Sequence, residues 1–406
     1  MYADDMVLMS LSEIDLQARM TRLEHYCNKW HLNINERKTK VMVVSKGRAP
    51  VCQISVCNHR LEQVDKYLYL GLEFSADGKM EQAQLNIKHR CLKAIFKLRS
   101  VVRDSNISPR LSLKLFDQMI KPIALYGCEI WGTLLNLKTP SQGTIGKILN
   151  KYEVTPIEKM HLKYCKYAVG GHSRSTNYAI LGELGRYPIL IDIISQILKY
   201  LRHLQTNESN NDILQEAFKE SKQIALHGGT SWFTTVNSIT RIVGVVQENM
   251  NKMRIKQVKN NLKSSFIHKW ADSLLRQSKM STYNTIKQSF CYENYLTIVK
   301  NKEHREAMTR MRTSSHKLMI EKGRYLNIPR NNRLCTKCSL GVVEDEEHAL
   351  LVCPAHELIR TTIMNKVKDM CPNLSQLDRQ NQVIYLLSAE GRVAILAAEL
   401  CYHALK

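Results

Sequence analysis

YADDMVLMS, from Tyr2 to Ser10, is the stretch that decides how the start of this chain is interpreted. Two adjacent carboxylates precede a short apolar run, which is typical of a tight turn that leads into a β-strand. Such a turn can hold two carboxylates beside a hard divalent cation, since oxygen ligands are those that Mg²⁺ prefers. Two Mg²⁺ ions held by such carboxylates support phosphoryl transfer. Acidic pairs at turns are also common as solvated groups, so the assignment of Asp4 and Asp5 as magnesium ligands depends on the segments downstream of them.

The hydrophobic pattern then alternates between helix and strand. Residues 13–30 carry apolar side chains at helical spacing, and Ser12 with Asp15 predicts a capping box at the start of that helix. β-branched residues within 32–45 predict a strand, and 66–74 predict a further strand region that ends near a turn. The beginning of the chain is therefore a mixed α and β unit.

Beyond residue 78 the pattern is helical. Residues 87–102 form an amphipathic helix with one apolar side, and its opposite side carries Arg90, Lys93 and Lys97. That cationic side could lie along a nucleic-acid backbone. Pro109 begins a further helix, and 127–143 is a candidate linker because it is rich in Gly, Pro and polar residues.

The overall composition fits a folded protein with a cationic surface. Lys and Arg number 59 against 37 Asp and Glu, so the formal net charge is +22. Such a surface favours polyanions, above all nucleic acid, because each phosphate neutralised by a cation releases a condensed counterion. A merely soluble basic surface is the alternative that charge alone leaves open.

The cysteines indicate a reducing compartment. Twelve occur in 406 residues and most are scattered singly, as expected for an intracellular protein of the nucleus or cytoplasm. Asp4 and Asp5 interrupt any apolar signal region, and no apolar run approaches the roughly 20 residues of a membrane span. We therefore expect no membrane partner.

Four metal-ligand side chains cluster near the other end of the chain, spaced Cys335-x2-Cys338-x9-His348-x4-Cys353. This spacing lets a short loop wrap one tetrahedral ion, and three thiolates with one imidazole are typical of a closed structural zinc site. We assign the site to folding and nucleic-acid handling rather than to catalysis. His356 is a nearby alternative to His348.

Four segments of the chain carry a resemblance to a known family: YADDMVLMS, LNINERKTK at 32–40, YLYLGLEF at 67–74 and LFDQMIKPIALYGCEIWG at 115–132. Their order resembles the palm and thumb of reverse transcriptases from non-LTR (LINE-type) retrotransposons. In the last segment, which resembles the thumb, Tyr126 and Trp131 are interpreted as core side chains rather than base-stacking groups.

The resemblance implies roles for individual residues. Asp4 and Asp5 would be catalytic and bind Mg²⁺, while Lys38 would lie near the phosphates of the incoming nucleotide. Residues 67–74 would form a hairpin that grips the primer, and the α-helical thumb would hold template RNA and primer DNA through Arg90, Lys93 and Lys97. The hairpin residues closest to the primer would be Tyr69, Leu70 and Gly71.

The surroundings of the cysteine cluster also resemble the family. RTSSH at 312–316, EKGRY at 321–325, VEDEEH at 343–348 and Cys353-Pro354 are similar to the segment that carries the C-terminal zinc knuckle of invertebrate LINE-type proteins. This context favours His348 over His356 as the fourth zinc ligand.

We therefore expect an α+β fold that is mostly α. The expected parts are a partial reverse-transcriptase palm with short antiparallel strands at 1–78, a helical thumb at 79–135, a helical connection at 136–311, a CCHC zinc-knuckle segment at 312–360 and a helical tail at 361–406.

One feature of the family is absent from the sequence. The resemblance implies a third carboxylate from an earlier palm strand, yet no Asp or Glu precedes Asp4. We therefore expect a fragment of an RNA-directed DNA polymerase that is inactive alone, although the intact protein would perform target-primed reverse transcription. The alternative is a non-catalytic zinc-knuckle protein that binds RNA or DNA, and a non-functional translation product also remains open.

Overall fold

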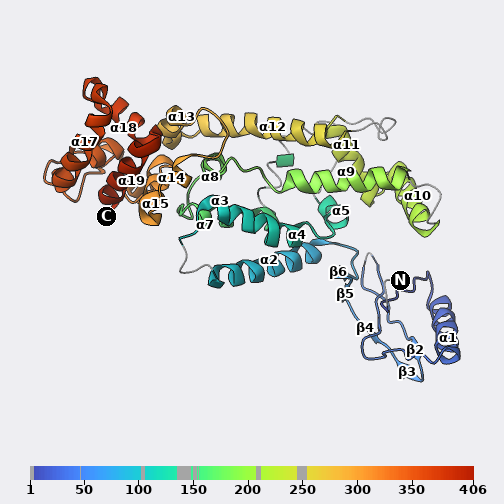
Figure 1. The fold of residues 1–406 in the computed structure, drawn as a ribbon. Coiled ribbons are helices and arrows are strands. Elements are labelled where there is room, and N and C mark those ends of the chain that lie inside the picture. Colours follow the sequence, from blue (N-terminus) through green and yellow to red (C-terminus); the bar gives the residue numbers. More distant parts are fainter. Residues whose placement is uncertain are drawn as a thin grey trace.

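The computed structural model is mostly helical with a few short strands, as expected for the α+β class. Figure 1 shows an elongated molecule, with a small strand-containing unit at one end, long helices in the middle and the C-terminal helices at the other end. No helix among the described residues is long and apolar enough to cross a membrane. The described residues are 4–45, 47–101, 106–134, 148–149, 153, 155–206, 212–244 and 254–406.

The N-terminal unit contains one helix, α1 (Glu13–Lys29), which confirms the helix predicted there. Ser12 caps it, because its side chain accepts a hydrogen bond from the backbone N–H of Asp15 at 3.2 Å. The predicted reciprocal half of the capping box is wrong. The carboxylate of Asp15 accepts instead from Ser10 Oγ at 2.7 Å and from Arg19 Nε at 2.9 Å.

The apolar side of α1 covers a small core of its own. Met20 and Cys27 are buried in α1, and Met20 joins a cluster that includes Ile54 and Val56 from the neighbouring loops and strand. Trp30, at the predicted end of the same apolar side, is 58% exposed and does not belong to this core.

The strands are shorter than the sequence pattern predicts. Only Lys40–Val41 of the predicted strand region 32–45 is a strand. Residues 66–74 form an antiparallel hairpin, as the resemblance implied, and the chain reverses at Leu70 and Gly71 with φ of 47° and 78°. The pairs are β1 (Lys40–Val41) with β4 (Glu62–Gln63) in parallel, and β2 (Ser55–Val56) with β3 (His59–Arg60) and β5 (Lys66–Tyr69) with β6 (Leu72–Ser75) in antiparallel.

The strand predicted for residues 6–10 is not formed. A strand needs a neighbour that pairs its backbone groups, and none of the named strands among the described residues pairs with this segment. Met6, Val7 and Met9 are consequently exposed, and Leu8 alone of this run packs on the small core.

A second, larger core joins the helices from α2 to α19. Their order and bounds are α2 (Glu81–Val101), α3 (Pro109–Leu115), a π-helical turn (Phe116–Ile120), α4 (Lys121–Leu125), α5 (Cys128–Trp131), α7 (Pro156–Ala168), α8 (Asn177–Glu183), α9 (Leu190–Thr206), α10 (Asp212–Leu226), α11 (Trp232–Ile242), α12 (Ile255–Leu275), α13 (Ser281–Ile286), α14 (Tyr295–Ile298), α15 (Lys302–Arg312), α16 (Met319–Tyr325), α17 (Glu357–Met370), α18 (Arg379–Ser388) and α19 (Gly391–Leu405).

The amphipathic pattern of α2 is confirmed, because its apolar side is buried while Arg90, Lys93 and Lys97 are exposed. Val102, assigned to the same apolar side, lies outside the described residues. The linker predicted at 127–143 begins instead with α5, whose Cys128 and Trp131 are fully buried. The large apolar side chain of Trp131 packs this segment against the larger core. The remainder from residue 135 lies outside the described residues.

A buried ion pair connects the middle and the C-terminal helices. Arg312 on α15 donates through Nε and Nη2 to the two carboxylate oxygens of Glu183 on α8, each at 2.9 Å, and Nη2 also lies 2.9 Å from Glu293. Tyr295 Oη on α14 donates to Glu183 at 2.7 Å, and Arg312 also donates to the carbonyl of Leu387 on α18. The helices of this region are thus held by one guanidinium.

Removing that guanidinium should be costly. We expect Arg312→Ala to lower the free energy of unfolding of the helical unit by about 3–5 kcal/mol, since it leaves the carboxylate of Glu183 buried without its partner. Lys219→Ala is the control, because the exposed pair of Lys219 and Glu216 contributes less than about 1 kcal/mol. Urea denaturation followed by circular dichroism measures both, and equal small losses would contradict the expectation.

Candidate functional site

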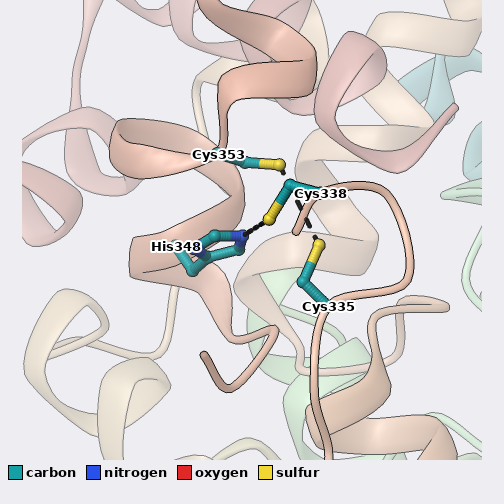
Figure 2. A group of neighbouring side chains, drawn as sticks. All are labelled: Cys335, Cys338, His348 and Cys353. Carbon is teal, nitrogen blue, oxygen red and sulfur yellow. Dashed lines mark hydrogen bonds between the residues drawn. The ribbon is translucent and has the colours of Figure 1, made fainter. Parts of the chain in front are cut away.

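Four side chains from two segments converge near the C-terminal end of the molecule. One ligand atom from each lies within 4.8 Å of every other, and the four residues are Cys335, Cys338, His348 and Cys353. Figure 2 shows the two cysteines of the loop facing the histidine and the cysteine of the following helical segment. The structure thus brings together all four ligands predicted from the spacing.

The first two ligands sit on a tight loop. Leu334 and Val343 form an isolated antiparallel bridge at its base, and the backbone N–H of Cys335 donates to the carbonyl of Val342 at 2.9 Å. Gly341 adopts φ of 63°, a left-handed conformation that glycine allows without strain. The backbone N–H of Lys337 points at Cys335 Sγ at 3.4 Å. The loop therefore aims both sulfurs inward.

The other two ligands lie on one π-helical turn, His348–Val352, and the residue that ends it. Asp345 Oδ1 accepts from the backbone N–H of His348 at 2.9 Å, and the N–H of Cys353 donates to the carbonyl of His348 at 2.7 Å. This hydrogen bond joins residues five positions apart, as in a π-helix, and it brings the side chains of residues 348 and 353 to the same side. Both are buried.

The distances fit a tetrahedral cation. Zn–S bonds of about 2.3 Å and a Zn–N bond of about 2.0 Å would separate two sulfurs by roughly 3.8 Å, and a sulfur from a nitrogen by roughly 3.5 Å. The structure has 3.9 Å between Cys335 Sγ and Cys353 Sγ, and 3.5 Å between Cys338 Sγ and His348 Nε2. The donor set also fits, since soft thiolates favour zinc over magnesium.

The protein environment shifts the pKa values of Cys335 and Cys338 in opposite directions. Burial raises the pKa of Cys335 to about 11, whereas a hydrogen bond from the backbone of Leu340 lowers the pKa of Cys338. Burial lowers the pKa of His348, which favours the neutral imidazole that a metal requires. A divalent cation would favour the thiolate form of the cysteines.

Two observations concern the choice between His348 and His356 as the fourth ligand. His348 Nδ1 is buried and has no hydrogen-bond partner among the described protein groups, although metal-bound imidazoles usually donate from their second nitrogen. His356, the alternative ligand, is not part of the four-residue group. The geometry therefore favours His348, as the sequence context did.

A second arrangement surrounds the tip of the β5–β6 hairpin. Tyr126 Oη donates to the carbonyl of Leu70 at 2.5 Å, and Arg90 Nη1 on α2 donates to the carbonyl of Gly71 at 3.0 Å. The guanidinium carbon of Arg90 lies 5.7 Å from the centre of the Tyr126 ring. These contacts fix the hairpin tip against the first helices of the larger core.

Tyr126 was not identified by sequence reasoning as an anchor. It is 44% exposed, so its interpretation as a core residue is wrong, whereas Trp131 is fully buried as expected. The tyrosine is 56 residues from the carbonyl that it binds. No local pattern could have revealed this contact.

The remaining predicted residues lie on the surface. Asp4 is in a turn and Asp5 in an isolated β-bridge, both exposed, while Tyr2 and Ala3 of the quoted stretch lie outside the described residues. Lys38 is exposed in a turn closed by Asn35, and its carbonyl accepts from Tyr67 Oη at 3.1 Å. Lys38 thus lies beside the hairpin.

Lys93 and Lys97 extend this surface along α2. Both side chains are exposed, and no ion pair engages them within the described part of the chain. Tyr69 is half-buried at the end of β5. Lys93 and Lys97 thus lie on the same helix as Arg90, which contacts the hairpin tip.

Comparisons with known proteins find one family model and two curated relatives. Residues 1–74 match the family model described as reverse transcriptase (RNA-dependent DNA polymerase). The chain is 27% identical over 133 residues to an uncharacterized transposon-derived protein of Caenorhabditis elegans, and 28% identical over 143 residues to the "Probable RNA-directed DNA polymerase from transposon BS" of Drosophila melanogaster. Each match covers 32% of this chain, but 47% of the first relative and 16% of the second.

The chain therefore spans less than half the length of these curated relatives. No solved structure matches it. The comparisons support a relationship to the reverse transcriptases of transposons.

The four-residue cluster predicts different outcomes for two neighbouring histidines. We expect the wild-type chain to purify with about one zinc ion per chain and His348→Ala with almost none, since the substitution removes one of four ligands. His356→Ala should retain the ion. Metal content measured by atomic emission tests this, and equal zinc content in the two variants would contradict the ligand assignment.

The hairpin anchor predicts a difference between two glycines. A side chain at residue 71 would meet φ of 78° and place its Cβ 3.3 Å from Tyr126 Cε1, whereas at residue 78 it would meet φ of 69° and only Val44 at 3.7 Å. Both substitutions cost about 1 kcal/mol of backbone strain. Only Gly71→Ala should accelerate amide hydrogen exchange at residues 69–72, and equal exchange in Gly71→Ala and Gly78→Ala would contradict the anchor.

Proposed function

We propose that this chain belongs to a non-LTR (LINE-type) retrotransposon reverse transcriptase and comprises its catalytic turn, thumb and C-terminal zinc knuckle. The observation that carries the proposal is the reverse-transcriptase match of residues 1–74, because that segment contains the acidic pair, Lys38 and the hairpin tip. In the intact protein this machinery would perform target-primed reverse transcription on a template RNA and a primer DNA.

In this proposal Asp4 and Asp5 hold Mg²⁺ near the end of the primer. Two carboxylates on a short turn are suitable oxygen ligands for a hard cation. Bound Mg²⁺ would assist the attacking hydroxyl and the leaving pyrophosphate. Lys38 would stabilise the phosphate charge that develops during nucleotide transfer, because it is an exposed cationic residue whose backbone carbonyl binds Tyr67 of the hairpin.

The hairpin and α2 would position the primer. Tyr69, Leu70 and Gly71 form the tip, and Gly71 lets a strand approach the backbone closely because it carries no side chain. Since Arg90 and Tyr126 hold the tip carbonyls, the tip keeps one position relative to α2. Lys93 and Lys97 on α2 would then follow the phosphates of the duplex.

The four-residue cluster would bind zinc as a structural ion. Three thiolates and one imidazole complete a tetrahedron, so the site offers no open position for a substrate. Its role in the proposal is to order the loop that contacts template RNA. From the scattered cysteines of the sequence, the proposed location is intracellular, in the nucleus or cytoplasm.

DNA synthesis should need more than this chain's acidic pair. Within the described residues, Asp4 and Asp5 are not joined by a third acidic side chain into a metal-binding group. Magnesium dehydrates reluctantly and binds well only where several oxygens converge. We therefore expect the polypeptide by itself to bind nucleic acid without polymerising nucleotides.

The alternative is a non-catalytic protein that binds RNA or DNA through its zinc knuckle. The specific observation in its favour is the complete metal-ligand cluster, which contrasts with the incomplete acidic one. Binding is common to both functions, so only a test of synthesis separates them.

Primer extension separates the two functions. We expect no synthesis by the chain alone, and synthesis when a second polypeptide supplies a palm strand with the third aspartate. Asp4→Ala should abolish that restored synthesis, at least about a hundredfold, because it removes a metal ligand. Asp369→Ala, an exposed aspartate on α17, should leave the rate unchanged.

Synthesis that persists in Asp4→Ala would contradict the assignment of the acidic pair. Absence of synthesis in the presence of the second polypeptide, together with retained RNA binding, would favour the non-catalytic alternative.

A further inference from the structure

A basic cavity lies where the end of α2, α3 and α7 meet α15. Its volume is about 270 Å³, and its walls include Arg99, Tyr167, Lys302, Arg305 and Arg310. Glu306 is the one carboxylate among its described lining residues. In Figure 1 the C-terminal end of α2 lies on the side of the molecule that faces α15. This cavity is separate from the metal centre and from the hairpin.

Arg99 has unused hydrogen-bonding capacity. Its guanidinium carbon lies 3.7 Å from the centre of the Tyr167 ring, so the side chain is stacked and held in place. Stacking leaves the N–H groups at the edge of the guanidinium free. Arg99 Nε is buried, and no described protein group accepts from it. A buried donor without an acceptor carries a cost that an anion in the cavity would remove.

The charges opposite Arg99 are only partly compensated. Glu306 forms an ion pair with Arg310 at 3.1 Å. Arg305 donates to neutral acceptors, the carbonyls of Val299 and Lys300 at 2.8 and 3.3 Å and Asn106 Oδ1 at 3.4 Å. Burial lowers the pKa of Arg305, and the charge of Glu306 offsets this effect only in part. Lys302 is exposed at the rim.

The cavity wall is shaped by a glycine. Gly170 has φ of 65°, and a Cβ there would lie 2.0 Å from Cγ of Glu306. The carbonyl of Gly170 accepts from Arg310 Nε at 2.8 Å. The close approach of α15 to the loop after α7 therefore depends on glycine at this position, and it brings the cations of α15 to face α2.

We propose that this cavity binds a phosphate group, with Arg99, Lys302 and Arg305 as the cationic contacts. Arginine donors at a fixed edge match the oxygens of a phosphate, and the stacked Arg99 is already ordered before binding. The volume is below the ~300 Å³ at which pockets begin to hold a whole small molecule, so it suits one phosphate rather than a complete nucleotide. That the phosphate belongs to a nucleic-acid backbone rests on the proposed function above.

The cavity would extend the binding surface of the thumb. Lys93 and Lys97 lie on the same helix as Arg99, and α15 supplies the opposite wall. A strand that follows α2 would thus meet cations from two regions about 200 residues apart in the chain, as the numbers 99 and 305 indicate.

The test measures affinity and salt dependence in the full-length chain. Wild type, Arg99→Gln, Lys302→Gln and the control Arg379→Gln, an exposed arginine of α18, are titrated with a labelled single-stranded RNA oligonucleotide. Arg99→Gln should weaken binding roughly tenfold, as one lost charge-assisted contact does. It should also reduce the slope of log K against log salt by about 0.7. Arg379→Gln should match wild type, and Arg99→Lys should recover part of the affinity.

Inorganic pyrophosphate, measured by calorimetry, is the second ligand. Loss of RNA affinity in Arg99→Gln and Lys302→Gln supports a backbone phosphate, and loss of pyrophosphate affinity alone supports a free phosphate compound in the same cavity. If both variants bind RNA and pyrophosphate as Arg379→Gln does, the cavity is not a phosphate site, while RNA binding by wild type still supports the proposed function. If wild type binds no RNA, the proposed function fails, and the pyrophosphate titration alone decides the cavity.

Discussion

The pairing of Arg312 with Glu183 is the constraint on which the helical part of the molecule depends. A guanidinium that is 2% exposed and a carboxylate that is fully buried can coexist only if their donors and acceptors are satisfied. The acceptors come from α8, the segment before α14, and α18, so all of these elements must be in place together. α15 is thereby fixed at its C-terminal end, while residues toward its N-terminal end line the basic cavity.

From this centre the two proposed functional regions extend in opposite directions. The chain runs from Arg312 through α16 into the loop that carries Cys335 and Cys338, so the metal centre is attached to a rigid helix. At the other end, the hairpin tip is attached to α2 and to Tyr126 by its backbone carbonyls. Both regions are short loops that a helical scaffold positions, which is how proteins commonly present binding residues.

The sequence predicted those features whose causes are local. The buried sides of α1 and α2 follow from helical periodicity, and the metal cluster follows from four ligands within 19 residues, from Cys335 to Cys353. The failures share a different cause. Residues 6–10 have the pattern of a strand but no paired neighbour among the described strands. The stretch 127–143 has the composition of a linker, but its residues 128–131 form a helix that packs against α2 and α9. The anchor at Tyr126 and the cavity at Arg99 combine residues far apart in the chain, where single-sequence patterns carry no information.

The central claim is that the hairpin and the metal centre contact the same nucleic acid. Ultraviolet crosslinking of the full-length chain to a primed RNA template, with mass spectrometry of the crosslinked peptides, tests it most directly. We predict crosslinks within residues 66–97 and within residues 335–353 of the same complexes, and loss of the second set after zinc is removed. Crosslinks that fall on neither segment, or a second set that persists without zinc, would contradict the claim.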